Sequence, residues 1–375
     1  MSNLVTHRST HSGRLERWLG KDRLDQLGGS MKGWYWKPIP LLDCPGSVRV
    51  GADGDFVGPF ERGVYMSALD ALEAAFQRAM RVPAHAGFHT GFTSISDALA
   101  RASGGFSQKP GGRFNKVGPT GVVGVTSSLH KLGPQPAAGV AAAAAPGGTA
   151  YVNTDTGGMR FTNPATGSVR LVGANISASV IGNSLLLYDR IFAVAKTMNS
   201  TATEAVTGVP TRFQSTTSTD ENYIGGNFGF IEVGLTALAA TAHNWTVCLY
   251  TDQAAASSTL PSLTGNSGAI VHRLDHPVQQ WFAPLAAGDV GIKAWTQMQC
   301  SAAVATGLIN FVIGHEIGFM SFPVINSVLP FDWLTNMCQA PYIPNDAYLA
   351  FLEINKPTTT ATTYTGTLYT TSTAS

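Results

Sequence analysis

Residues 291–300 read GIKAWTQMQC, and the order of side chains in this stretch predicts a β-strand. Two sets of side chains alternate along it: Ile292, Ala294, Thr296 and Met298 form one set, and Lys293, Trp295, Gln297 and Gln299 form the other. Successive side chains of a strand point to opposite faces of the sheet, so a period of two assigns the two sets to different faces. We therefore expect a sheet whose two faces differ.

Short runs of the same β-rich kind recur between turn signals in the second half of the chain. They are residues 168–172, 185–195, 228–235, 245–251, 308–313 and 348–354. Seven or eight such strands at irregular spacing predict a mainly β domain, with a two-sheet β-sandwich of jelly-roll topology as the leading expectation. The long connections 197–227 and 252–289 are where we expect contacts between subunits.

Low-complexity composition marks the expected domain boundary. Residues 133–150, GPQPAAGVAAAAAPGGTA, contain little besides Ala, Gly and Pro. We therefore divide the chain into an N-terminal arm with a small α-containing segment (1–132), a linker (133–150), a β-sandwich domain (151–356) and a Thr-rich C-terminal arm (357–375).

The N-terminal part is expected to mix short helices with an extended arm. Apolar residues repeat at three and four residues from Leu69 to Met80, which predicts a helix over 68–81. Shorter helices are expected over 12–27 and 94–102. Residues 33–40, GWYWKPIP, combine three aromatics with two prolines and favour extended backbone. Anchoring in the core of the same subunit and docking on a neighbour are both open for this arm.

The C-terminal segment 357–375, PTTTATTYTGTLYTTSTAS, carries no charge. Thr and Tyr favour extended backbone, so residues 363–367 are predicted to form a strand that pairs along the edge of a sheet, in its own subunit or an adjoining one. If the segment is a docking arm, its deletion should weaken assembly and leave the monomer folded. The expected interface residues of the two arms are Trp34, Tyr35, Trp36, Tyr364, Leu368 and Tyr369.

Charge is scarce and unevenly distributed. Asp, Glu, Lys and Arg make up 13% of the chain, about half of the roughly 25% in an ordinary soluble domain. Small residues take their place, and they suit flat contacts between proteins because no charge is desolvated. Residues 1–116 hold 15 basic and 10 acidic side chains, whereas the remainder holds 9 and 13. This asymmetry favours head-to-tail contacts between copies, or non-specific contact of the first segment with nucleic acid.

Targeting signals and membrane spans are not expected. No run approaches about 18 uninterrupted apolar residues, so we expect no membrane partner. The N-terminal residues lack the apolar region of a signal peptide. The four cysteines, Cys44, Cys248, Cys300 and Cys338, show no paired spacing, and Cys248 and Cys300 are expected to be free, buried thiols. A reduced, intracellular assembly history fits these features.

Three short motifs resemble catalytic or metal sites and fail on their chemistry. His315-Glu316 begins a zinc-protease motif, but Phe319 stands where the second imidazole is needed, so a hydrogen-bonded structural His315 is the better interpretation. The Asp53-Gly-Asp55 turn lacks the further oxygens of a calcium loop. His85 and His89 are separated by Gly87, which does not favour a helical ligand pair. We therefore assign no catalytic, cofactor or metal residue and expect no enzyme.

The layout of the whole chain resembles the virion structural proteins of tailed bacteriophages, in particular capsid-associated or decoration proteins. The features that carry the resemblance are the aromatic N-terminal segment, the Ala/Gly/Pro linker, the charge-poor Thr-rich β domain and the uncharged C-terminus. The long spine helix of the common phage head fold is not found. The resemblance implies a homo-oligomer, such as a trimer, that is made in the host cytoplasm and assembles with other virion proteins.

Three other functions stay open. A neck or tail component of the virion would occupy a ring of six or twelve copies. A carbohydrate-binding module for host attachment would use exposed Trp and Tyr. A secreted soluble β-protein would also account for the low charge.

Overall fold

The structure is a computed structural model. It describes residues 112–161, 168–218, 220–277, 279–333, 340–354 and 356–372, together with the backbone of Arg49–Val50 and Phe56–Val57. The chain divides into two compact units, one of Met1–Val82 with Thr93–Asp97 and one of Pro83–Phe92 with Ala98–Ser375.

In the first unit the described residues form one antiparallel pair, β1 (Arg49–Val50) with β2 (Phe56–Val57). The helices predicted over 12–27, 68–81 and 94–102 and the extended arm at 33–40 lie outside the described residues.

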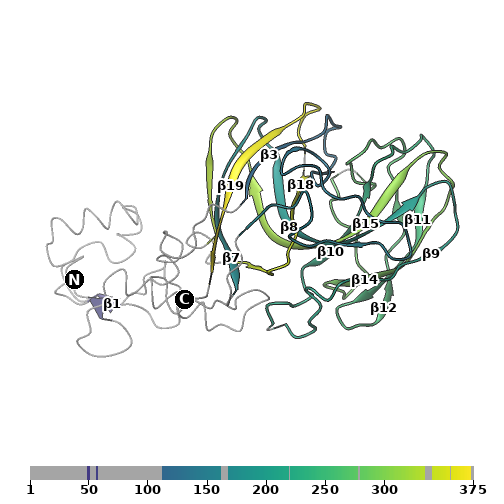
Figure 1. The fold of residues 1–375 in the computed structure, drawn as a ribbon, viewed down its shortest axis with the longest axis horizontal. Helices are drawn as coiled ribbons and strands as arrows, with labels where there is room; N and C mark the ends of the chain where they lie inside the picture. The colour runs from purple at the N-terminus through teal and green to yellow at the C-terminus, as the bar shows by residue number, and fades with distance from the viewer. Residues whose placement is uncertain are drawn as a thin grey trace. The chain divides into compact units, whose positions relative to one another are not determined.

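The described part of the second unit contains only strands, turns and loops, and its paired strands are all antiparallel. The described strands of this unit form three sheets, whose labelled strands can be followed in Figure 1. The prediction of a mainly β protein is therefore confirmed.

The central sheet is built around two long neighbouring strands. In spatial order its strands are β10 (Asn227–Val233), β15 (Leu308–Ser321), β8 (Ser184–Thr197), β18 (Leu349–Ile354) and β4 (Ser127–Ser128), and β6 (Thr149–Ala150) also pairs with β8. Every residue of β8 except Thr197 is buried. Because both faces of β8 are covered, its sequence is a nearly continuous apolar run without alternation.

A bulge divides β8 into two halves. Ile313 pairs with Phe192 and Gly314 with Arg190, so Ile191 is the extra residue in the ladder. An extra residue shifts the alternation of the side chains by one position. Leu187 and Phe192 therefore point to the same face, although their numbers differ in parity.

The second sheet contains the strand from which the fold was predicted. Its order is β12 (Ser257–Thr259), β11 (Asn244–Asp252), β14 (Ile292–Cys300) and β9 (Glu204–Ala205), with β13 (Leu263–Thr264) also paired to β11.

The strand at β14 is confirmed, but the face predicted for Trp295 is wrong. Trp295 is buried, on the side of Ile292 and Met298. Thr296 and Lys293 have no paired residue on β11, so each is the extra residue of a β-bulge. Each bulge shifts the alternation of the side chains by one residue. The two bulges thus bring the large apolar side chains of β14 to one face.

The third sheet includes the C-terminal segment as an interior strand. Its order is β16 (Leu329–Asp332), β7 (Val169–Ala178), β19 (Thr363–Ser372), β3 (Arg113–Val117) and β5 (Pro134–Gln135), with β17 (Tyr342–Ile343) also paired to β7. Strand β19 pairs with β7 along one side and with β3 along the other. The segment expected to be an arm is therefore hydrogen-bonded within its own subunit, between two strands rather than at an edge.

Residues 133–150, expected to form a linker between domains, lie within the second unit. Their two ends form β5 and β6, which belong to different sheets, and Ala144 forms a bridge with Ala195 of β8. Strands β3 and β4 of the expected N-terminal segment also belong to these sheets. The Ala/Gly/Pro segment thus runs along the β-structure, because its small residues permit close backbone contact.

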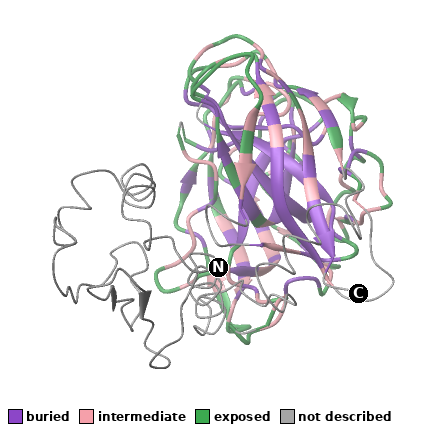
Figure 2. Cartoon of the chain, turned by 90° about the vertical axis from the view of Figure 1, so that its left-hand side faces the viewer, coloured by how far each residue is buried: buried purple, intermediate pink, exposed green. Residues whose placement is uncertain are grey.

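The described residues form three apolar core clusters. The first combines residues of β8, β10 and β15 with residues of β11 and β14. The second combines residues of β8, β15 and β18 with residues of β3, β7 and β19. The third adds the loop residues Tyr151, Leu274 and Tyr348 to β8, β10, β15 and β18. Figure 2 shows the buried strands inside and exposed loops at their ends. The central sheet thus contributes to every cluster.

Candidate functional site

Two charged residues lie side by side in the middle of β8. Asp189 and Arg190 are both completely buried. Consecutive strand residues point to opposite faces, so each of the two needs its own partner. An unpaired buried charge costs several kcal/mol, roughly 3–5 when a partner is removed. The sequence contains a signal for this feature, an Asp-Arg pair inside the apolar run 185–194, but neither residue was among the predicted site residues.

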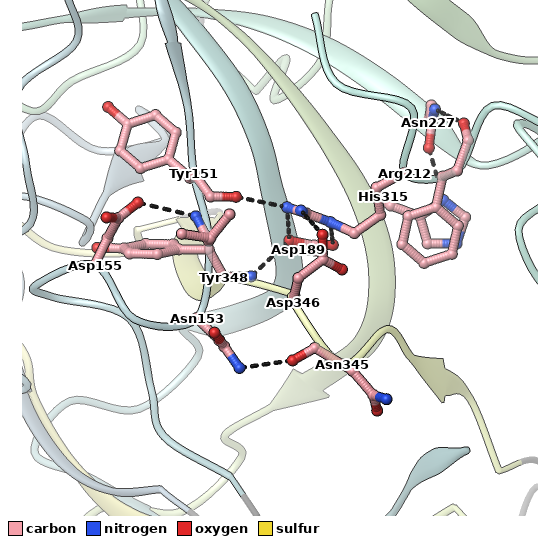
Figure 3. Close-up of polar contacts among 12 residues, drawn as sticks. Tyr151, Asn153, Asp155, Asp189, Arg212, Asn227, His315, Asn345, Asp346 and Tyr348 are labelled. Carbon is pink, nitrogen blue, oxygen red and sulfur yellow. Dashed lines mark hydrogen bonds and ion pairs between the residues drawn. The ribbon is translucent and has the colours of Figure 1, made fainter. Parts of the chain in front are cut away.

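Arg212 is the partner of Asp189, as Figure 3 shows. Its Nε donates to Asp189 Oδ2 at 2.6 Å and its Nη2 donates to Oδ1 at 2.9 Å. The same guanidinium donates to Asp346 Oδ2 (3.1 Å) and to the Tyr151 carbonyl (3.0 Å). The backbone N–H of Tyr348 donates to Asp189 Oδ1 at 2.9 Å. One guanidinium thus ties two loops to the centre of β8.

Asp189 is costly to keep ionised. Burial raises the pKa of its carboxyl to about 6, and the opposing effect of the Arg212 guanidinium does not cancel this. A bidentate guanidinium is the geometry that best compensates a buried carboxylate. Arg212 is therefore required for Asp189 to be charged at neutral pH.

The second ion pair lies on the opposite face of β8. Arg190 Nη2 donates to Glu232 Oε1 at 2.6 Å, and Asn310 Nδ2 donates to the same oxygen at 2.9 Å. The Arg190 guanidinium also lies 4.9 Å from the centre of the Tyr151 ring. Burial alone would raise the pKa of Glu232, but the positive charge of Arg190 lowers it to about 2. This pair stays ionised and connects β8 to β10 and β15.

His315 of β15 stacks on Phe213 next to the Arg212 cluster. The two ring centres are 3.6 Å apart and the planes are inclined by 6°. Asn227 uses its Nδ2 to donate to the carbonyls of Phe213 and Ile292, so its Oδ1 accepts a hydrogen bond from His315 Nδ1 (2.8 Å). Burial and, to a smaller extent, the charge of Arg212 lower the pKa of His315 to about 3. His315 is therefore a neutral, hydrogen-bonded residue.

The zinc-protease resemblance is thus replaced by a structural role. Residues 315–319 lie on strand β15, not on a helix, and the prediction of a hydrogen-bonded His315 is confirmed. Among the described residues no group of three or more His, Cys, Asp or Glu side chains is placed to hold a metal ion. Asp53, Asp55, His85 and His89 lie outside that part of the chain.

The expected interface residues of the C-terminus have different surroundings. Tyr364 and Leu368 are buried in the second apolar cluster of their own chain. Tyr369 is partly exposed, and its hydroxyl accepts a hydrogen bond from Asn175 Nδ2 at 2.9 Å. Trp34, Tyr35 and Trp36 lie outside the described residues. Tyr364 and Leu368 thus face their own core and have no surface to offer a neighbour.

The cysteine prediction is confirmed where the structure describes it. Cys248 and Cys300 are free and buried in the first apolar cluster. Burial raises the pKa of the Cys248 thiol to about 12. Cys44 and Cys338 fall on residues that are not described. In the described part of the chain there is also no helix long and apolar enough to cross a membrane.

Exposed branched apolar side chains occur on loops at one end of the central and third sheets, and we call this surface the apolar end. Its members are 47–65% exposed: Val122, Val123, Ile181, Val324, Ile325 and Val328. They come from three loops, which follow β3, β7 and β15. The sequence gives no direct signal for this surface, because the three loops are far apart along the chain.

Hydrogen bonds hold these loops together. The loop after β7 bonds to the loop after β15 through Gly182 N–H to the Phe322 carbonyl (2.8 Å) and Asn326 N–H to the Ala178 carbonyl (2.9 Å). The loop after β3 bonds to the segment before β19 through Gly121 N–H to the Thr359 carbonyl (2.9 Å). Thr363, the first residue of β19, accepts a hydrogen bond from the N–H of Ser179 in the loop after β7 at 3.0 Å. The exposed apolar side chains therefore belong to loops whose backbones are hydrogen-bonded to neighbouring segments.

Comparison with known proteins gives no relative: no family model, no curated protein and no solved structure matches this chain. What the fold and the site define is a mainly β protein with paired charges in its core.

Proposed function

We propose that this chain is a structural subunit of a virus particle, a capsid or decoration protein of a tailed bacteriophage, which packs against copies of itself and other virion proteins. The observation that carries the proposal is the apolar end. Branched side chains that are about half exposed gain roughly 25 cal/mol for each Å² of apolar surface removed from water. Several of them on neighbouring loops at one end of two sheets suit a contact surface between proteins.

The distribution of charge supports the same function. Only 13% of the residues are charged, and several of these charges are used inside the core, as in the pairs Asp189–Arg212 and Arg190–Glu232. Few charges are left to keep subunits apart. Subunits of a closed assembly use the same patch repeatedly, which suits such a surface.

The finer architecture we propose is a β-sandwich of jelly-roll type. Its support is the first apolar cluster, which draws residues from the central sheet and from the second sheet. Large side chains of the two sheets contact each other there, with the rings of Trp245 and Phe311 4.9 Å apart. An experimental structure at side-chain resolution tests this topology directly.

The wild-type oligomeric state is the first test of the function. Light scattering of the purified full chain at micromolar concentration is expected to give the mass of a closed oligomer. Electron microscopy of the same sample is expected to show assemblies of regular symmetry. A stable monomer under these conditions would contradict the proposal.

The two alternatives have distinguishable outcomes. Rings of six or twelve copies in the micrographs would favour a neck or tail component over a shell protein. A carbohydrate-binding module needs exposed aromatics, and of the tryptophans in the described part Trp245, Trp295 and Trp333 are buried while Trp281 is partly exposed. Binding on a glycan array that is lost in Trp281→Ala would favour this module. Contact of residues 1–116 with packaged nucleic acid rests on their net positive charge alone.

A further inference from the structure

A lysine, an asparagine and a glutamate meet in the core where β8 begins and β18 ends. Asn183 directly precedes β8, Glu353 belongs to β18, and Lys356 follows β18. The two strands are antiparallel neighbours whose ladder ends with Ser184 opposite Ile354. Asn183 and Glu353 are fully buried and Lys356 is 1% exposed. Three such polar side chains together in a core need a specific reason.

The carboxylate of Glu353 lies between the amine and the amide. Its Oε1 accepts from Asn183 Nδ2 and from Lys356 Nζ at 3.4 Å each, and Lys356 Nζ is 3.4 Å from Oε2 as well. Asn183 Nδ2 and Lys356 Nζ therefore both contact the same atom, Glu353 Oε1. The Tyr364 hydroxyl donates to Oε1 at 3.0 Å and fixes the carboxylate.

The asparagine side chain is held on one side and open on the other. Its Nδ2 also donates to Thr362 Oγ1 at 2.5 Å. Its buried Oδ1 has no hydrogen-bond partner among the described residues. An unpaired buried carbonyl oxygen is costly, so hydrogen bonding of the amide does not by itself explain why Asn183 is placed here.

The glycine-containing loop 118–121 packs against the side chains of Glu353 and Lys356. A Cβ at Gly118 would lie 2.6 Å from Glu353 Oε2, and one at Gly121 would lie 2.6 Å from Lys356 Cδ. Lys356 Nζ also donates to the Pro119 carbonyl at 2.8 Å. The backbone of 118–121 thus packs directly on the side chains and excludes water. Exclusion of water and close placement are the two conditions that let an amine attack an amide.

We propose that Lys356 and Asn183 become joined by an intramolecular isopeptide bond, formed in the folded chain with Glu353 as the proton carrier. Glu353 takes a proton from the Lys356 ammonium, and the neutral Nζ attacks Cγ of Asn183. Glu353 then delivers this proton to the departing Nδ2 and takes up the second proton, which Nζ releases as it becomes an amide nitrogen. The Cγ–Nδ2 bond breaks, the Nζ–Cγ bond forms and ammonia leaves, so no oxidant or cofactor is consumed. Burial raises the pKa of Glu353, which suits a carboxyl that accepts and returns a proton.

The bond would connect the start of β8 covalently to the end of β18. It would close a loop that includes most of the described fold, and a cross-link over a long loop restricts the unfolded chain strongly. The inference rests on the buried cluster and not on the proposed function, so either one can fail without the other.

Intact-mass spectrometry of the purified full chain under denaturing, reducing conditions tests the bond. The expected mass is lower than the sequence mass by one ammonia, about 17 Da. Tandem spectrometry of a proteolytic digest is expected to find a branched peptide that contains both Asn183 and Lys356. A wild-type mass equal to the sequence mass overturns the proposal, and so does a branched peptide that joins other residues.

Variants separate the roles of the three side chains. Glu353→Gln and Lys356→Met are each expected to show their full calculated masses, because the proton carrier or the amine is missing. Lys293→Arg replaces a lysine of β14 outside the cluster and is expected to keep the loss of ammonia. A loss of ammonia that persists in Lys356→Met overturns the assignment. If a variant does not fold, the wild-type mass and the branched peptide still decide the question.

Discussion

At the scale of single residues, the side chains whose loss should lower the free energy of unfolding most are the charged ones buried in the core. Asp189 and Arg190 are adjacent on a strand whose other side chains are almost all apolar, and each has a guanidinium or carboxylate partner on its own face. Such pairs add little net stability when intact, because desolvation offsets the attraction between the charges. They are costly to break.

Arg212→Met tests this asymmetry. The variant leaves the Asp189 carboxylate buried without a counter-charge, and we expect the free energy of unfolding to fall by roughly 3–5 kcal/mol. Chemical denaturation at neutral pH measures it. Asp189→Asn in the same chain should recover part of the loss. The exposed Arg113→Met serves as the control, with an expected change of about 0.5 kcal/mol or less. Equal effects of the two single variants would refute the role of the pair.

His315 gives the protein a pH dependence with a defined sign. Its folded-state pKa is lowered to about 3, below the unfolded value near 6.5, so the unfolded chain binds the proton first. The contribution of His315 to stability is therefore complete above about pH 6.5 and is lost as the pH falls through the window down to about 3.

The measurement is urea unfolding of wild type and His315→Gln at pH 7 and pH 5. We expect wild type to lose about 2 kcal/mol more than the variant between these two values. The comparison cancels the other titrating groups, such as Asp189, whose raised pKa acts in the opposite direction. Identical pH dependence of the two proteins would show that the imidazole is accessible to protons in the folded state.

At the scale of elements, the position of strand β19 shows that the C-terminal segment is part of a sheet of its own chain. It lies between β7 and β3, and it supplies Tyr364 and Leu368 to the second apolar cluster. Thr365, between them in sequence, is exposed. The strand is thus a two-faced element of a sheet, and its removal would leave both neighbouring strands with unpaired backbone groups.

Leu368→Ala and Thr365→Ala form a matched pair on this strand. We expect Leu368→Ala to lower the free energy of unfolding by about 2–5 kcal/mol, because it creates a cavity in the core. Thr365→Ala should change it by about 0.5 kcal/mol or less. Denaturant unfolding at several protein concentrations measures both. A loss for Leu368→Ala that appears only where subunits associate would support a docking arm instead.

At the scale of the whole molecule, loops that are distant in sequence lie at the same end of the central and third sheets. The triple variant Val324→Ser, Ile325→Ser, Val328→Ser removes apolar side chains from the apolar end without touching a buried residue. We expect it to shift the mass in light scattering from the oligomer toward the monomer. Leu235→Ser with Val290→Ser is the matched control, since these side chains are also 57% and 56% exposed but lie on other loops. If only the control variant dissociates, the contact surface lies elsewhere.

Local patterns were sufficient for the strands and for the state of single side chains. The runs 185–195, 228–235, 245–251 and 348–354 coincide with β8, β10, β11 and β18 to within a few residues. The buried Cys248 and Cys300 and the hydrogen-bonded His315 were also predicted. These properties depend on the side chains of one segment and on their period, which the sequence displays directly.

The sequence did not predict which side chains and strands pair, or which face of a sheet a side chain occupies; these came from the tertiary structure. The bulges at Ile191 and Thr296 reverse the alternation, and a bulge depends on the strand opposite rather than on local sequence. The pairing of Asp189 with Arg212, of Asn183 with Glu353 and of β19 with β3 joins residues that are separated along the chain. The sequence alone thus determined which segments are strands, because backbone preference is local. Only the fold decided which strands meet and which charges are paired, because contacts between distant segments depend on the whole chain.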